Sequence, residues 1–131
     1  MIFGIGCDLC QIGRLEKSLT GPHGATFARR VYGPQERAAL HLPWAEAPTK
    51  TQRQSAAANF AAKEAFLKAA GRGLGGFDLA EIQSLREKSG APYYVLGPGV
   101  SAWMAENELT AHLTLSHEND MALAVCLLEK R

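Results

Sequence analysis

The sequence predicts an α+β fold in which helices pack against an antiparallel sheet. Helix-like patterns dominate between residues 11 and 71, whereas strand-like patterns open the chain and return after residue 76. The chain has 131 residues, and 47% of them are hydrophobic, which is enough for the core of one domain. We therefore expect a single domain over residues 1–131.

The first expected element is a strand over residues 1–9, because its side chains alternate between two faces. One face carries Phe3, Ile5, Cys7 and Leu9, and the other carries Ile2, Gly4, Gly6 and Asp8. Since two glycines leave the second face bare, a helix, a ligand or an ion could approach the backbone there. Asp8 fits a functional role, as a carboxylate at the end of this face, or a structural role, as a helix N-cap or turn residue.

Three short helices are expected next, over residues 11–19, 26–31 and 34–42, followed by a loop over residues 43–49. Pro34 stands at the first position of the third helix, where proline is favoured because no partner is needed for its missing N–H.

The second half of the chain is typical of two antiparallel strand pairs with a helix between them. Turn-forming residues at 88–92 and 118–120 separate the members of each pair. The expected elements are strands over residues 79–87 and 93–96, a helix over residues 97–108, and hairpin strands over residues 112–117 and 121–128.

The central helix is the most informative element. Ser55 or Thr51 can cap its start, and Gly71 suits its end. After Asn59 the helix is apolar apart from three charged side chains, and a helix that is apolar on every side is normally buried. Those charges are Lys63, Glu64 and Lys68.

Buried charges are uncommon unless they are paired or hold an ion. Glu64 and Lys68 are four residues apart and therefore share a face of the helix. Two interpretations remain open: a structural ion pair at the edge of the core, or a functional site. The following segment, residues 71–76, has four glycines beside Arg72, and such a turn lets backbone N–H groups cradle a phosphate.

Composition excludes several classes of protein. No apolar run reaches the ~18 residues needed to span a membrane, and residues 1–9 lack the charged start of a secretory signal. Three cysteines are an odd number, which favours a reducing cytoplasm. Cys7 and Cys10 have the spacing of half a zinc site, but no second close Cys or His pair completes it.

The net charge of +1 argues against general nucleic-acid binding. The charge is uneven, however, since residues 1–53 hold seven Lys and Arg against four Asp and Glu. This half is either an ordinary solvated surface or a docking face for an acidic partner. Its basic residues include Arg14, Lys17, Arg29, Arg30 and Arg37.

His117 follows Ser116 at the end of the first hairpin strand, where a histidine is either a structural hydrogen-bonding group or part of a site. Ser116, His117 and Asp120 are crowded into one hairpin without a nucleophile elbow, which argues against a serine-hydrolase triad.

Three segments together resemble the holo-[acyl-carrier-protein] synthases, the small trimeric class of 4′-phosphopantetheinyl transferases. They are GIGCD at residues 4–8, FAAKEAFLKA at 60–69 followed by GRGLG at 71–75, and LTLSH at 113–117. The central motif is the most specific, and FARRV at 27–31 and GAPY at 90–93 extend the resemblance over nearly the whole chain.

The resemblance implies the 4′-phosphopantetheinyl transferase fold and magnesium-dependent transfer of the phosphopantetheine arm of coenzyme A to a serine of an acyl carrier protein. Adenosine 3′,5′-bisphosphate would leave. The carrier could serve fatty-acid biosynthesis, polyketide synthesis or another pathway. The resemblance also implies a homotrimer whose active sites lie between subunits, with the Ser-His strand end reaching the site of a neighbouring chain.

The same resemblance assigns roles to individual residues. Asp8 and Glu64 would bind magnesium, Lys68 would face the pyrophosphate, and these three would be the catalytic residues. The residues expected to bind the coenzyme are Lys63, Lys68, Gly71, Arg72, Gly73, Ser116, His117 and Arg53, in a site near the turn at residues 71–75. The resemblance implies an acidic carrier, and the residues expected to dock it are Arg14, Lys17 and Arg30 of the basic half of the chain.

The chemistry of the residues agrees with these roles. Breaking a pyrophosphate requires charge neutralisation more than covalent help, and magnesium typically takes one or two carboxylates. Asp8 and Glu64 supply two, and Lys68 adds a positive charge. Either Glu64 or a magnesium-bound water could accept the serine proton.

Asn59 departs from the family pattern, since many relatives have arginine or another larger residue there. A phosphate contact would then be lost or moved to Arg53 or Arg72. The alternative function is a non-catalytic oligomeric module that binds a nucleotide or phosphate. Retention of Asp8, Glu64 and Lys68 together favours the enzyme, because mere binding does not need all three.

Overall fold

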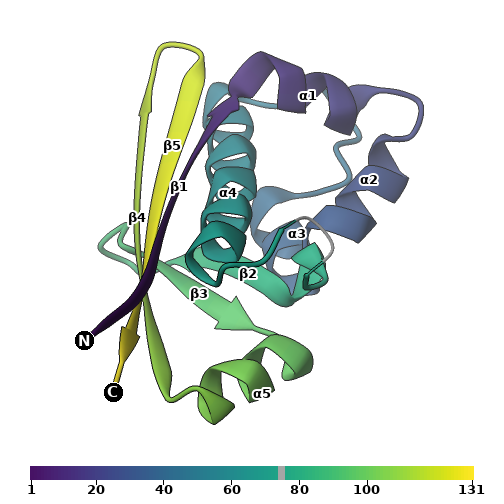
Figure 1. Cartoon of the computed structure of the whole chain (residues 1–131). Coiled ribbons are helices and arrows are strands. Elements are labelled where there is room, and N and C mark those ends of the chain that lie inside the picture. Colours follow the sequence, from purple (N-terminus) through teal and green to yellow (C-terminus); the bar gives the residue numbers. More distant parts are fainter. Residues whose placement is uncertain (74–75) are drawn as a thin grey trace.

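The computed structural model describes residues 1–73 and 76–131 and confirms the α+β class (Figure 1). A three-stranded antiparallel sheet has the order β1-β5-β4, and β2 pairs with β3 in a separate sheet. The strands are β1 (Ile2–Gln11), β2 (Ile82–Arg86), β3 (Pro92–Leu96), β4 (Leu109–Glu118) and β5 (Met121–Lys130). The helices are α1 (Ile12–Thr20), α2 (Gly24–Val31), α3 (Pro34–Leu40), α4 (Lys50–Ala69), α5 (Pro98–Glu106) and the 3₁₀ helix η1 (Leu79–Glu81).

Helix α4 occupies the centre of the molecule, between the three-stranded sheet and helices α1 to α3 (Figure 1). Its alanines, together with Phe66 and Leu67, form much of the core against the inner face of β5. None of the helices in the described residues is long and apolar enough to cross a membrane.

Gly4 and Gly6 of β1 allow α4 to approach the sheet closely. A Cβ atom on Gly4 would lie 1.9 Å from the carbonyl oxygen of Ala69, and one on Gly6 would lie 2.0 Å from that of Ala65. Of the three groups that could approach this bare face, a helix is therefore the one that does. The close contact brings the end of α4 alongside Asp8.

The start of α4 differs from its prediction. Thr49 caps the helix in a capping box, in which its Oγ1 accepts from the N–H of Gln52 at 3.0 Å and its own N–H donates to Gln52 Oε1 at 2.9 Å. The predicted caps, Ser55 and Thr51, were wrong because the helix begins earlier, at Lys50, and both lie inside it.

The end of α4 agrees with its prediction. Gly71 adopts a φ of 75°, a conformation that glycine tolerates best. The N–H of Arg72 donates to the carbonyl of Leu67 at 2.9 Å, and that of Gly71 donates to Lys68 at 3.1 Å. These two bonds form a Schellman motif, which turns the chain sharply at the end of the helix.

Two other boundaries moved for local reasons. The strand expected from residue 79 begins at Ile82, because Asp78 Oδ1 accepts from the N–H of Ala80 at 3.1 Å and starts η1. Helix α3 ends at Leu40 rather than at residue 42, because His41 turns into the left-handed region with a φ of 59°.

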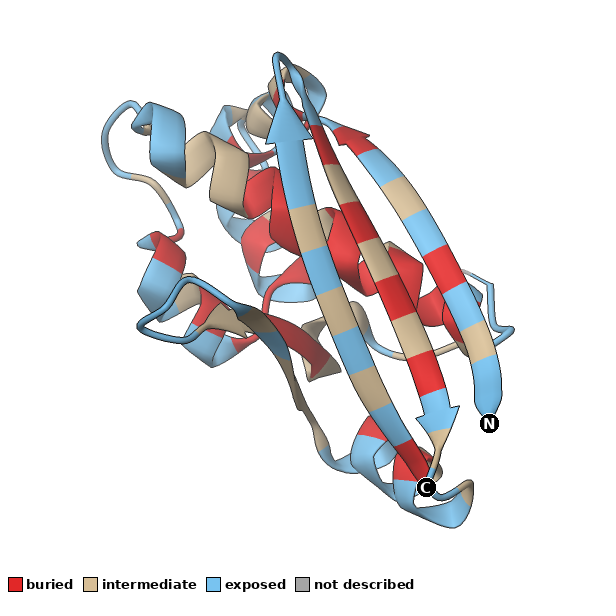
Figure 2. Ribbon diagram, turned by 90° about the vertical axis from the view of Figure 1, so that its left-hand side faces the viewer, coloured by how far each residue is buried: buried red, intermediate tan, exposed pale blue. Residues whose placement is uncertain are grey.

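The sheet face that points away from α4 is apolar and exposed. Along β1, the exposed fraction is 40% for Phe3, 64% for Ile5 and 61% for Leu9. Figure 2 shows exposed and less exposed residues alternating along β1 and β4, whereas β5 between them alternates buried and intermediate ones. We call the side chains of Phe3, Ile5, Leu9 and Met121 the outer apolar face.

Candidate active site

Asp8 and Lys68 meet where β1 passes the end of α4. Lys68 Nζ donates to Asp8 Oδ1 at 3.1 Å and to the carbonyl oxygen of Cys7 at 2.9 Å. Asp8 lies within β1 and is paired with Ala124, so it is not a helix N-cap; Gln11 precedes α1 instead. The Asp8 side chain is only 17% exposed, whereas that of Lys68 is 55% exposed and open to a ligand.

Glu64 joins this pair from one turn earlier on α4. Burial raises the pKa of its carboxyl, and the negative charge of Asp8 raises it further, whereas Lys68 acts in the opposite direction. The shift shows that the three charged groups share one electrostatic environment. We call Asp8, Glu64 and Lys68 the acidic cluster.

The acidic cluster suits a magnesium ion by its donor chemistry. Magnesium usually takes one or two carboxylates, with phosphate oxygens and waters completing the octahedron, and Asp8 and Glu64 supply two. Residues 1–73 and 76–131 contain no group of three or more His, Cys, Asp or Glu side chains placed to hold a metal. An ion at Asp8 and Glu64 would therefore need further oxygen ligands besides these two carboxylates, such as waters or phosphate oxygens.

The turn after α4 leaves open space beside the acidic cluster. A Cβ atom on Gly71 or Gly73 would meet nothing within 4 Å, so a ligand can approach this backbone. Arg72 lies over two aromatic rings, with its Cζ 4.6 Å from the centroid of Phe77 and 5.6 Å from that of Trp103. Leu74 and Gly75, which belong to the same predicted segment, lie outside the described residues.

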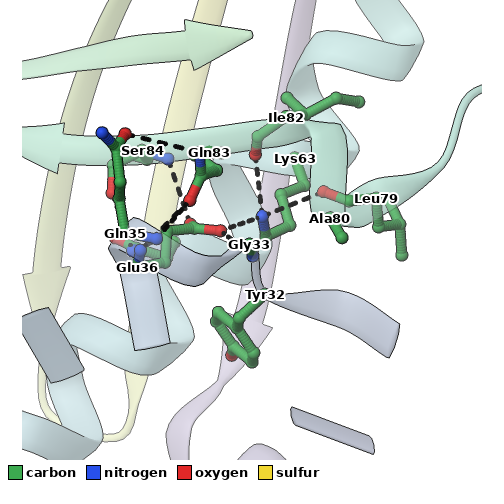
Figure 3. Close-up of polar contacts among 12 residues, drawn as sticks. Tyr32, Gly33, Gln35, Glu36, Lys63, Leu79, Ala80, Ile82, Gln83 and Ser84 are labelled. Carbon is green, nitrogen blue, oxygen red and sulfur yellow. Dashed lines mark hydrogen bonds and ion pairs between the residues drawn. The ribbon is translucent and has the colours of Figure 1, made fainter. Parts of the chain in front are cut away.

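Lys63 does not face this open space, although the resemblance had grouped it with the coenzyme-binding residues. Its ammonium is fully buried, pairs with Glu36 of α3, and donates to the carbonyl oxygens of Leu79 at 3.0 Å and Ile82 at 2.7 Å (Figure 3). These three contacts use all its donors. Lys63 therefore ties α4 to α3, η1 and β2 and has no donor left for a ligand.

Glu36 is the partner that the sequence analysis missed. Its carboxylate also accepts from the backbone N–H of Gly33 and of Ser84, each at 3.0 Å, and from Asn59 Nδ2 at 3.0 Å. Burial raises its pKa, whereas the neighbouring charge of Lys63 lowers it. The available signal was the position of Glu36 three residues after Gly33 at the start of α3, where a glutamate can accept from the N–H of the N-cap residue.

Ser116 and His117 lie apart from the acidic cluster within one chain. In the sheet register, Leu115 pairs with Ala124 of β5, and Ala124 pairs with Asp8 of β1, so a whole strand separates the two sites. Ser116 and His117 line a different cavity, of about 240 Å³, whose other lining residues are Thr51, Gln54, Ser55, Ala58, Arg86, Gly90 and Leu115.

The predicted docking residues are on the surface of the helices near β1. Arg14 and Lys17 are exposed on α1, and Arg30 is exposed on α2. Arg14 also lines a shallow cavity together with Phe27. Arg53, expected at the coenzyme, instead lies 3.4 Å from Glu16 of α1, with both side chains partly exposed.

The cysteines form no metal site with one another. Cys7 is exposed, whereas Cys10 is buried on the other face of β1, beside Ala122. Burial is the main reason that the pKa values of Cys10 and Cys126 rise to about 11, so both remain protonated thiols at neutral pH.

The fold and the acidic cluster define a class of protein. The family model described as the 4′-phosphopantetheinyl transferase superfamily matches residues 4–126. Within this superfamily, the chain is 39% identical over 132 residues to a holo-[acyl-carrier-protein] synthase of Aromatoleum aromaticum, with both chains fully covered. It is 37% identical over 131 residues to one from Bordetella parapertussis, covering 99% of this chain and 84% of that one. The chain therefore belongs to the holo-[acyl-carrier-protein] synthase family.

Solved structures agree with this assignment. The crystal structure of the synthase from Neisseria meningitidis has a TM-score of 0.85 and 32% identity, covering 99% of this chain and all of that one. A synthase from Bacillus anthracis in complex with CoA (3′,5′-ADP) has a TM-score of 0.80 and 29% identity, covering 100% and 99% of the two chains.

Proposed function

We propose that this protein transfers the 4′-phosphopantetheine group of coenzyme A to a serine of an apo acyl carrier protein, with magnesium, and releases adenosine 3′,5′-bisphosphate. The observation that carries the proposal is the acidic cluster, in which two carboxylates and an exposed ammonium lie beside an open glycine turn. Relatives named holo-[acyl-carrier-protein] synthases and a relative bound to the coenzyme support it.

The residues divide the chemistry between them. Asp8 and Glu64 would hold the magnesium ion, which supplies neutralisation of the charge on the pyrophosphate. Lys68 has an exposed ammonium that stabilises negative charge on the leaving phosphate. Glu64 or a water bound to the magnesium would accept the proton of the attacking serine.

We further propose a homotrimer in which each active site is shared between two subunits. The outer apolar face supports it, because contiguous exposed apolar surface normally marks an interface. The separation of Ser116 and His117 from Asp8 supports it as well, since a neighbouring subunit can bring the two halves together. The free cysteines favour a reducing compartment, and we propose the cytoplasm.

The acidic carrier protein would dock on the basic helices near β1. Arg14 tests this proposal, because its side chain is exposed in the first turn of α1 and a partner can reach it. Arg14→Glu should raise KM for the carrier and leave KM for coenzyme A unchanged. The effect should weaken as salt is added, because screening acts over about 8 Å at physiological ionic strength.

A mass measurement tests the function itself. The protein is incubated with apo carrier protein, coenzyme A and magnesium, and the carrier is weighed. The expected result is the mass increase of one phosphopantetheine, which disappears when magnesium is chelated. Tight binding of coenzyme A without any mass increase would favour the non-catalytic binding module.

A further inference from the structure

Arg86, the last residue of β2, presents a half-buried guanidinium that pairs with no acid. Its Nη2 donates to Asn59 Oδ1 at 2.8 Å, and its Nη1 donates to Ser84 Oγ at 3.0 Å. No carboxylate among the described residues lies within ion-pair distance of it. Glu36 acts on Arg86 electrostatically, but that carboxylate is already paired with Lys63. The guanidinium, whose own hydrogen bonds go to neutral groups, therefore adds a positive charge for a ligand.

Two cavities meet at this side chain. The cavity of about 240 Å³ brings hydroxyl groups and an imidazole to Arg86, and no Asp or Glu lines it. Ser116 and His117 also border a neighbouring cavity, which Glu118 lines and which does not include Arg86. A second cavity, of about 370 Å³, also borders Arg86 and includes Asn59 and Tyr93, again without an acid. Hydroxyls, an imidazole and a guanidinium around one hollow are the donors that bind a phosphate.

We propose that Arg86, positioned by Asn59, binds the terminal phosphomonoester of coenzyme A. This inference rests on the proposed function. The coenzyme carries a pyrophosphate, whose cleavage takes place at the acidic cluster, and a separate phosphate on its ribose. The cavity at Arg86 lies away from Asp8, Glu64 and Lys68 and suits the second group.

The geometry favours Arg86 over the two arginines expected to replace an arginine at position 59. Arg53 reaches toward Glu16, and Arg72 lies over the ring of Phe77. Asn59 is 3% exposed, and its amide nitrogen donates to Glu36 and to the Ser84 carbonyl, each at 3.0 Å. Its remaining oxygen holds Arg86. Asn59 is therefore a positioning residue, and Arg86 is the group that contacts phosphate.

The test compares coenzyme A with 3′-dephospho-coenzyme A, which lacks only this phosphate. Arg86→Gln should raise KM for coenzyme A by about 10- to 100-fold, the effect of losing a charged hydrogen bond. It should leave kcat and the KM for the dephospho substrate within about twofold of the wild type, and Arg86→Lys should recover part of the loss. Lys88→Gln, which removes the same charge from an exposed residue of the adjoining turn, is the matched control.

An equal loss with both substrates, or no loss with either, would overturn the inference and leave the proposed function intact. An Arg86→Gln protein that folds poorly would also lose activity equally with both substrates. In that case the KM values of the folded Arg86→Lys protein for the two substrates decide whether Arg86 contacts the phosphate. If the wild type transfers nothing, the binding of adenosine 3′,5′-bisphosphate and of adenosine 5′-monophosphate is compared by calorimetry. If the wild type binds the bisphosphate more tightly and Arg86→Gln loses this preference, the inference is supported although the proposed function has failed. If the wild type shows no preference, both the inference and the proposed function are rejected.

Discussion

Lys63 and Glu64 are neighbours in the sequence but have opposite roles, because one residue turns an α-helix by about 100°. Lys63 points into the core and forms an ion pair with Glu36, whereas Glu64 points toward Asp8 at the surface. A structural ion pair, one of the two alternatives that the sequence left open, is therefore present, and the candidate site lies on another face of the same helix. The buried pair is formed by Lys63 rather than by Glu64 and Lys68.

The environment of Glu64 predicts a conflict between stability and activity. Because burial and Asp8 raise its pKa, the stability linked to this carboxyl is present at low pH and is lost as the pH rises through the folded-state pKa. Glu64→Gln should therefore raise Tm at neutral pH in the presence of a chelator, with no gain well below the ordinary pKa of 4.5. The same variant should lose about 100-fold or more in kcat/KM.

Thermal melts at several pH values, with and without magnesium, check this prediction. Magnesium should raise the Tm of the wild type, because a ligand that binds only the folded state stabilises it. It should have little effect on Glu64→Gln. A lower Tm for the variant at neutral pH would show that Glu64 is a stabilising group and not a strained one.

The buried ion pair gives a second prediction at the residue scale. Lys63→Met should leave Glu36 without its counter-charge and reduce the free energy of unfolding by about 3–5 kcal/mol. The loss should shrink as the pH falls, because protonation removes the unpaired charge of Glu36. Urea denaturation at two pH values measures it, and Glu36→Gln/Lys63→Met should recover part of the stability. Independent, additive losses would contradict the pairing.

At the scale of elements, the contact between β1 and α4 is what brings Asp8 to Glu64 and Lys68. Gly6→Ala should reduce the free energy of unfolding by about 3 kcal/mol, because its Cβ would lie 2.0 Å from a backbone oxygen of α4 that cannot move alone. Gly73→Ala is the control, since its Cβ meets nothing within 4 Å, and its effect on stability should stay within about 0.5 kcal/mol. Similar losses in both variants would contradict close packing.

The helices and strands were predictable from sequence because their periodicities and the signals at several of their ends are local. The glycine face of β1 predicted a close approach, and Gly71 predicted the end of α4. The sequence did not predict Glu36 as the partner of Lys63, since they are 27 residues apart and meet only through tertiary packing. It did not predict Arg86 for the same reason: Asn59 and β2 come together only when β2 packs against α4.

At the scale of the whole molecule, the two halves of the proposed site predict complementation between inactive variants. Asp8→Ala should be inactive and His117→Ala impaired, whereas a refolded mixture of the two should exceed both. In a mixed trimer, one interface can pair an intact Asp8 with an intact His117. Transfer activity is measured on refolded mixtures whose oligomeric state is determined by light scattering. Mixed trimers with only the average activity of their parents would reject the shared site.

The strand order β1-β5-β4 has a consequence for synthesis on the ribosome. Among the described elements β1 emerges before all others, yet its partner is β5, which emerges after all others. The N–H of Lys130 donates to the Met1 carbonyl at 2.8 Å. Until β5 leaves the exit tunnel, the sheet that supports α4 cannot close. The nascent chain must therefore keep the backbone of β1 unpaired until β5 has emerged, which makes β1 a segment that a chaperone would protect.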